Sequence, residues 1–195
     1  MFDQIEFMGE FFEGLTAVDE AIVQRVAEGG CEHCLGPLHR GDYPRKPRGG
    51  LIGVAAEALE RRFSLCCGRE GCRRRATPPS VRFLGRRVYV GAVVIVASVF
   101  ALATAARAGV QATGVPARTT RRWLGWWRGP FVETAVFASL SGRLVPAPSR
   151  GEVPTSLLAR MVGSPHERVE KLLSWLAPLT TGSVSDGSRF VRGIV

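Results

Sequence analysis

The pattern of apolar and polar positions begins with one helical stretch. Apolar residues in the first thirty positions follow the spacing of a helix, at Ala21, Ile22, Val26 and Ala27. Thr16 and Asp19 have the spacing of a capping box, which indicates a helix start, and the two glycines at 29–30 indicate its end. Residues 1–30 are therefore expected to form a short helical lead-in.

Residues 31–80 have a different pattern, with many turn formers between short apolar runs. Residues 36–50 are rich in glycine and proline, which favour turns. Apolar and polar residues alternate over 62–66, which predicts a strand, and residues 73–76 are expected to return as the next strand. The prolines at 78–79 mark the end of this segment.

Two helices are expected between residues 81 and 130. Residues 88–106 form a run of nineteen uncharged, mostly apolar positions, which predicts one long helix. Pro116 is expected to start a second helix, because proline is tolerated in a first turn. This helix is expected to run to Trp127 and to stop at the Gly-Pro pair at 129–130.

The last third of the chain contains one clear amphipathic segment, at 165–176. Its apolar residues have i, i+3, i+4, i+7 spacing, at Val169, Leu172, Leu173 and Leu176. Three prolines before it indicate a linker. The Gly-, Ser- and Thr-rich residues after Pro178 indicate a flexible tail.

The net charge of +9 is concentrated in the middle of the chain. Residues 1–30 carry one basic and seven acidic residues (net −6), 31–130 carry eighteen and five (net +13), and 131–195 carry seven and five (net +2). The basic residues of the middle part are arginines except Lys46, and arginine suits phosphates and guanine edges. A nucleic-acid partner is therefore expected, although a GC-rich genome would also enrich arginine.

The cysteines form a pair and a trio, at Cys31, Cys34, Cys66, Cys67 and Cys72. The first thirty residues lack the basic start and apolar run of a signal peptide, so the cysteines are expected to stay reduced and to bind metal. A structural zinc site takes four ligands, which predicts Cys31, Cys34, Cys67 and Cys72, with Cys66 a weaker choice than Cys67. His33 and His39 are alternative ligands. In the other interpretation no metal binds and the adjacent cysteines are apolar core residues.

Residues 114–123 have the pattern of the turn and second helix of a helix-turn-helix. An apolar stripe is expected at Thr120, Trp123, Leu124 and Trp127. The outer face then carries Arg118, Thr119, Arg121 and Arg122, which are expected to enter the major groove of duplex DNA. Pro116 stands where a capping serine is common, and residues 105–113 are short for a first helix. The alternative is a surface helix with solvated arginines.

The two cysteine groups, the run Arg73-Arg74-Arg75 and the Gly-Val motif at 114–115 together resemble the N-terminal part of insertion-sequence transposases. Residues 38–50 and 66–89 also resemble a group of short bacterial proteins associated with mobile elements, and the likeness covers about residues 15–180. In those transposases a zinc ribbon precedes a helix-turn-helix that binds the element's terminal repeats. The resemblance implies DNA binding near a transposon, with the three consecutive arginines on phosphates.

An enzyme is not expected from this sequence. Strand-transfer enzymes hold two metal ions with three carboxylates on a folded sheet. The acidic residues after residue 131 are few and scattered, at Glu133, Glu152, Glu167, Glu170 and Asp186. Neither a glycine-rich phosphate loop nor a Ser/His/Asp arrangement is present in the sequence.

The uncharged run at 88–106 is long enough to cross a bilayer, so a small inner-membrane protein with one span there is an alternative. Alanines together with Gly91, Ser98 and Thr104 dilute its hydropathy. Spanning would also place the cysteines and the arginine helix on opposite sides of the membrane. A buried central helix is the preferred interpretation.

Together these patterns predict a mainly α protein with a small zinc ribbon (α+β) and a helical domain that contains a helix-turn-helix. The expected organisation is an acidic lead-in, a zinc ribbon, a long apolar helix with the helix-turn-helix, and a C-terminal helical extension with a flexible tail, at 1–30, 31–80, 81–130 and 131–195. The expected function is binding of duplex DNA in the cytoplasm at the nucleoid, with a structural Zn²⁺ and in association with a transposon. The alternative is an adaptor that binds a protein such as a transposase through the acidic lead-in and the C-terminal helix.

Overall fold

A computed structural model of the chain describes residues 9–46, 56–84, 89–103 and 114–192. By their internal contacts the residues fall into two units. The sheet unit consists of 8–48, 53–90 and 173–195, and the helical unit consists of 1–7, 49–52 and 91–172.

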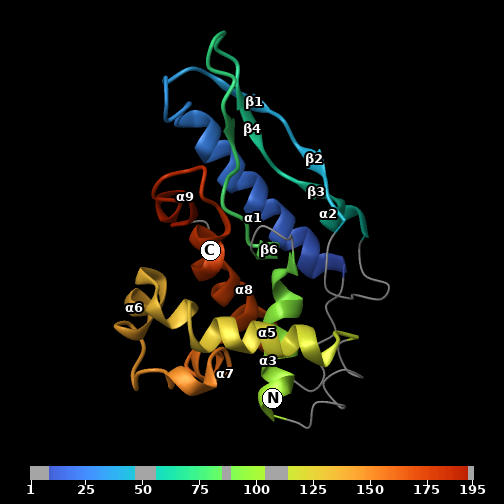
Figure 1. Cartoon of the computed structure of the whole chain (residues 1–195), viewed down its shortest axis with the longest axis vertical. Coiled ribbons are helices and arrows are strands. Elements are labelled where there is room, and N and C mark those ends of the chain that lie inside the picture. Colours follow the sequence, from blue (N-terminus) through green and yellow to red (C-terminus); the bar gives the residue numbers. More distant parts are fainter. Residues whose placement is uncertain (1–8, 47–55, 85–88, 104–113, 193–195) are drawn as a thin grey trace. The chain divides into compact units, whose positions relative to one another are not determined.

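The sheet unit combines one long helix with very short strands and the last segments of the chain (Figure 1). Its described elements are α1 (Gly9–Glu28), β1 (Leu38–Arg40), β2 (Tyr43–Pro44), α2 (Ala56–Glu60), β3 (Arg61–Arg62), β4 (Leu65–Cys67), β5 (Arg75–Ala76), β6 (Phe83–Leu84), β7 (Tyr89–Val90), the 3₁₀ turn η3 (Ala177–Thr180) and α9 (Ser188–Val191).

Each pair of strands in the described residues is antiparallel. A three-stranded sheet has the order β1-β4-β5, and two further ladders join β2 with β3 and β6 with β7. In the larger sheet Leu38 lies opposite Cys67, and Leu65 lies opposite Ala76. The strand predicted at 62–66 is therefore present as β3 and β4, and the predicted return strand is present as β5. The fold class is mixed α+β, as expected.

Helix α1 begins earlier than the sequence predicted. Its buried stripe starts one turn before the expected capping box and consists of Phe12, Leu15, Asp19, Ile22, Val23 and Val26. The capping box was wrong, because Thr16 lies inside the helix and its hydroxyl donates a 2.7 Å hydrogen bond to the carbonyl of Phe12. The apolar period of the whole stretch outweighs the local capping signal.

Asp19 of α1 is the centre of a buried polar network. Its side chain is 1% exposed and accepts hydrogen bonds from Ser80 Oγ at 2.6 Å, Val81 N at 2.7 Å and Arg82 Nε at 2.8 Å. Arg82 is equally buried, donates to the carbonyl of Ala58 and lies over the ring of Phe63. The network fixes α1 against the segment that leads into β6, because the carboxylate and the guanidinium neutralise each other's charge away from water.

The end of the chain packs within the sheet unit. The backbone N–H of Thr77 donates to Ser183 Oγ at 2.7 Å, and that of Ser80 donates to Thr180 Oγ1 at 2.9 Å. Arg25 of α1 donates to the carbonyl of Arg192 at 2.6 Å. The structure therefore differs from the predicted flexible tail, because hydroxyl side chains of the tail satisfy backbone groups next to β5 that lack a strand partner.

The helical unit is built mainly from short helices (Figure 1). Its described elements are α3 (Gly91–Ala103), α5 (Ala117–Arg128), η1 (Phe131–Glu133), α6 (Ala135–Ser141), η2 (Arg150–Glu152), α7 (Thr155–Leu158) and α8 (Pro165–Leu176), the last of which continues into the sheet unit from Leu173.

Helix α3 is the buried helix that the uncharged run predicted. Residues 91–99 are all buried, and its Ser98 Oγ accepts a 3.1 Å hydrogen bond from the indole N–H of Trp127 in α5. In the part of the chain that is described, no helix has both the length and the apolar character to cross a membrane. Residues 104–106 of the predicted helix lie outside that part.

Helix α5 confirms the second predicted helix, which begins after Pro116 and ends before Gly129. Its buried residues are Thr120, Trp123 and Trp127, and Leu124 is half-buried. Trp127 packs edge-on against Phe131 at a centroid distance of 4.9 Å, which extends the core of the helical unit into η1. The first helix of the predicted helix-turn-helix, at 105–113, lies outside the described residues.

Helix α8 has the bounds that the sequence predicted. The four residues of its apolar stripe, Val169, Leu172, Leu173 and Leu176, have no exposed surface. A capping box that the sequence analysis did not use starts the helix. The N–H of Ser164 donates to Glu167 Oε2 at 2.6 Å, and the N–H of Glu167 donates to Ser164 Oγ at 3.3 Å.

Asp19→Ala is expected to lower the free energy of unfolding by about 3–5 kcal/mol, because it leaves the Arg82 guanidinium buried without its counter-ion. The neighbouring Glu20 offers a matched control. Glu20 pairs with Arg40 at 2.6 Å, but the two side chains are 48% and 44% exposed, so Glu20→Ala is expected to cost no more than about 1 kcal/mol. Urea unfolding of both variants checks this, and equal losses would contradict it.

Candidate metal centre

The first two cysteines lie on a tight turn that follows α1 directly. The N–H of Cys31 donates to the carbonyl of Gly36 at 2.9 Å, and the N–H of Leu35 donates to the carbonyl of Cys31 at 2.7 Å. Leu35 has φ of +57°, in the left-handed region that lets the chain reverse right after Cys34. These bonds place both thiols on the same side of the turn.

The other two cysteines lie at the last residue of β4 and in the loop that leads from it to β5. The N–H of Cys67 donates to the carbonyl of Arg74 at 2.9 Å, and the N–H of Cys72 donates to the carbonyl of Arg69 at 3.1 Å. Gly71 has φ of +82°, a conformation that favours glycine. The turn thus accommodates the two extra residues between Cys67 and Cys72, so both cysteines can reach the same site although their spacing is longer than that of Cys31 and Cys34.

The sulfur atoms of Cys31, Cys34, Cys67 and Cys72 all lie within 4.8 Å of one another. Cys31 Sγ is 3.8 Å from Cys72 Sγ, and Cys34 Sγ is 3.5 Å from Cys67 Sγ, and all five cysteines are free thiols. A tetrahedron with metal–sulfur bonds of ~2.3 Å has sulfur–sulfur edges of about 3.8 Å. The four cysteines could therefore hold one metal ion with little movement.

Cys66 is outside this cluster, which contains Cys67. Adjacent strand residues point to opposite faces, so the two thiols of β4 diverge. The Cys66 thiol donates to the carbonyl of Arg73 at 3.4 Å instead. The histidines that the sequence offered as alternative ligands, His33 and His39, are likewise not among the described residues whose ligand atoms lie together.

Two glycines in the cysteine loops, Gly36 and Gly68, occupy positions where a Cβ atom would collide with a neighbour. A Cβ on Gly36 would lie 3.1 Å from Cys67 Sγ and 3.3 Å from Cys34 Sγ. A Cβ on Gly68 would lie 2.4 Å from Nε2 of His39, which packs across the second loop. In the sequence, a glycine two residues after Cys34 and a glycine next to Cys67 were the signals of these tight loops, because neither position has room for a side chain.

The thiols affect one another's ionisation. The backbone hydrogen bond from Gly36 lowers the pKa of Cys34 to about 7, against the effect of burial. The hydrogen bond from Arg69 lowers the pKa of Cys67, but burial and the neighbouring thiols raise it to about 12. Four thiolates so close together need a cation, and a metal ion must displace the remaining protons. Metal affinity should therefore fall as the pH falls.

The three consecutive arginines follow the second loop at the surface. Arg73, Arg74 and Arg75 are all exposed. Arg75 is anchored, because its Nη1 donates to the carbonyl of Gly41 at 2.7 Å and to Ser64 Oγ at 3.0 Å. Arg73 and Arg74 make no side-chain hydrogen bond or ion pair to any described residue, so their guanidinium groups face solvent.

In the helical unit, the outer face of α5 carries the other predicted contact residues. Arg118, Arg121 and Arg122 are exposed and Thr119 is half-buried, opposite the buried Thr120. The side chains of Arg118, Thr119, Arg121 and Arg122 line a shallow surface hollow of about 380 Å³. The helix contains no acidic residue, so nothing on α5 itself neutralises this face.

Replacing Cys67 by serine is expected to abolish stable metal binding, whereas Cys66→Ser is expected to leave one metal ion per chain. Serine is a poor substitute for a thiolate ligand, and Cys66 lies on the other face of β4. The measurement is the metal content of the purified variants, with thermal unfolding before and after chelation. Loss of metal in Cys66→Ser but not in Cys67→Ser would overturn the assignment of the ligand.

Comparison with known proteins assigns no family to the chain. No family model, curated protein or solved structure matches it. The likeness to the N-terminal part of insertion-sequence transposases therefore stays a prediction from the sequence, and the function is proposed from the geometry of the described residues.

Proposed function

We propose that the chain is a zinc-stabilised protein that binds duplex DNA and acts in association with a transposon, with no catalytic domain in this sequence. The observation that carries the proposal is the exposed arginine face of α5, on which Arg118 and Arg121 make no ion pair to the described residues. An α-helix about 10–12 Å wide fits the ~12 Å major groove of B-DNA.

The metal in this proposal is Zn²⁺ in a structural role. Zinc favours four tetrahedral ligands with cysteine sulfur among the commonest, and four thiolates leave no coordination position for a water molecule. The ion would stabilise the fold of the sheet unit, which would then form a zinc ribbon. It would take no part in a chemical reaction. The proposal therefore gives the metal no catalytic step.

The two arginine surfaces have different roles in the proposal. The side chains of Arg118 and Arg122 on α5 would reach base edges, where arginine pairs with guanine through two hydrogen bonds. Arg73, Arg74 and Arg75 would contact phosphates, which position a protein on DNA without reading its sequence. The two surfaces belong to different units, so each is testable by itself.

An adaptor that binds a protein partner is less well supported. The helices that would carry such an interface are α1 and α8, and both bury their apolar stripes within the chain. The acidic Glu20 on α1 is already paired with Arg40. Neither helix presents the exposed apolar anchor that a helix needs for docking into a partner's groove.

Arg118→Ala is expected to weaken binding of a preferred duplex by about 1–3 kcal/mol and to relax the preference at one base position. Arg74→Ala is expected to weaken the binding of all DNA sequences by the same factor, because it removes only a phosphate contact. The measurement is a titration of each variant with preferred and random duplexes at two salt concentrations.

Arg143→Ala is the charge-matched control, because Arg143 is exposed in the helical unit but lies outside α5. It is expected to change affinity little for either duplex. Equal losses for Arg118→Ala and Arg143→Ala on both duplexes would leave only a non-specific basic surface. No binding at low salt by metal-loaded protein would remove the DNA proposal, and the adaptor would then be favoured.

A further inference from the structure

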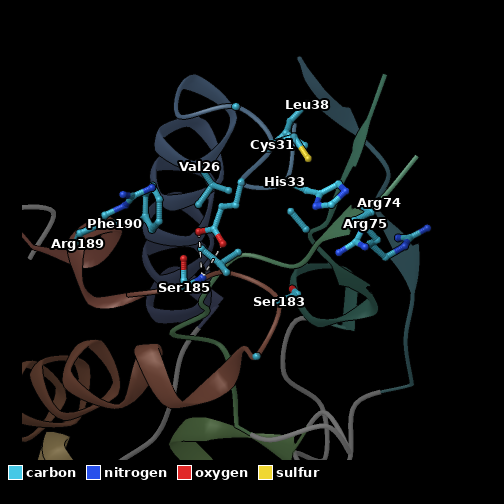
Figure 2. A pocket seen from close by; sticks show the side chains of 15 residues that line it. Val26, Cys31, His33, Leu38, Arg74, Arg75, Ser183, Ser185, Arg189 and Phe190 are labelled. Carbon is cyan, nitrogen blue, oxygen red and sulfur yellow. Dashed lines mark hydrogen bonds between the residues drawn. The ribbon is translucent and has the colours of Figure 1, made fainter. Parts of the chain in front are cut away.

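A pocket of about 490 Å³ lies beside the cysteine cluster in the sheet unit (Figure 2). One wall comes from the first cysteine turn, a second from β5 and the residue before it, and the third from the C-terminal segment around Ser185 and α9. Pockets that hold small-molecule ligands commonly measure ~300–1,000 Å³. The pocket is therefore large enough for a ligand of nucleotide size.

The rim of this pocket is basic on two sides. Figure 2 shows Arg74 and Arg75 on one side and Arg189 on the other. The Arg74 side chain makes no hydrogen bond or ion pair with the described residues, and Arg189 only lies over the ring of Phe190, with its Cζ 4.4 Å from the centroid. Arg74 and Arg189 thus lie on opposite sides of the pocket with no ion pair to the described residues, and Glu32 is the one acidic residue among those that line it.

Glu32 marks the position where the pocket already holds an anion. Both of its carboxylate oxygens lie 3.0 Å from the backbone N–H of Ser185, which donates to them. The carboxylate is exposed and comes from the turn between Cys31 and Cys34. An external anion that entered the pocket would meet the same N–H donor and the same arginines, in competition with this carboxylate.

The interior of the pocket is apolar where its rim is charged. Val26, Cys31, Val184 and Phe190 line it and are each no more than 6% exposed. Apolar lining residues together with arginines on two sides of the rim suit a ligand that joins a phosphate to a less polar body, because guanidinium groups bind phosphate oxygens in pairs. Inorganic phosphate alone would leave most of the volume unused.

We propose that this pocket binds a nucleotide, free or at the end of a DNA strand, with its phosphate at the backbone N–H of Ser185 in place of the Glu32 carboxylate. The exposed side chains of Arg74 and Arg189 would move to meet the phosphate there. Glu32 limits the affinity by holding a like charge at the phosphate position. This inference deepens the proposed function, since it rests on Arg74 as a phosphate contact, but it involves no residue of α5.

Glu32→Gln gives the sharpest test, because glutamine keeps an oxygen that accepts from Ser185 N–H but removes the negative charge. Calorimetric titration with deoxyadenosine monophosphate is expected to show about fivefold tighter binding, the effect of one like charge at contact distance in water. A gain in affinity cannot arise from misfolding. Metal content is measured in parallel, because Glu32 lies between two of the cysteines.

Arg74→Ala and Arg189→Ala are each expected to weaken nucleotide binding about tenfold or more, as the loss of a hydrogen bond to a charged group does. Arg143→Ala, with the same change in net charge, is expected to have no effect. Deoxyadenosine, which lacks the phosphate, is expected not to bind. Equal affinity for nucleotide and nucleoside, or unchanged affinity in Glu32→Gln, would overturn the proposal.

Single-stranded oligonucleotides with and without a 5′-phosphate distinguish the two sources of the nucleotide. Binding that requires the 5′-phosphate and is competed by the free nucleotide supports the pocket as a strand-end site, and binding of the free nucleotide alone supports a free ligand. No binding of either by metal-loaded protein at low salt would refute the inference. Arg118→Ala should leave nucleotide binding intact, so failure of duplex binding and failure of the pocket are separable.

Discussion

The fold of the sheet unit depends on four cysteine sulfur atoms that lie within 4.8 Å of one another. As thiolates they repel, and only a cation between them removes that cost. The strands around them are two or three residues long, so their ladders contain few hydrogen bonds and cannot hold the two cysteine turns together alone. A metal ion held there would join the turn after α1 to the loop that follows β4, and its binding energy would then be part of the folding energy.

The cysteine cluster lies next to the residues that are proposed to bind phosphate. Arg73 and Arg74 follow Cys72 directly, and Glu32 lies inside the first turn, where its carboxylate holds the N–H of Ser185. The position of the phosphate contacts and of the pocket therefore depends on the geometry of the cluster. The arginine face of α5 depends on a different core, in which Trp127 is bonded to Ser98 of α3. Metal loss should thus affect the first surface more than the second.

The sequence predicted the parts of this structure that have strong local signals. Helix α8 and the outer face of α5 followed from apolar periodicity, and the cysteine spacing predicted which thiols could meet. The Asp19–Arg82 pair was missed, because a contact between residues so far apart in the chain has no local pattern. The contacts of the tail were missed, since composition does not reveal that its hydroxyl groups complete the hydrogen bonding of Thr77 and Ser80. The capping signal at Thr16 did not mark the start of α1, because a longer apolar stripe extends the helix before it.

Four cysteines that hold one zinc ion would organise the sheet unit, and X-ray absorption at the zinc edge measures this on protein purified without added metal. We expect one zinc per chain with four sulfur neighbours at about 2.3 Å. A preparation that is folded but carries no zinc would contradict it. So would a shell in which nitrogen or oxygen at about 2.0 Å replaces one of the sulfurs.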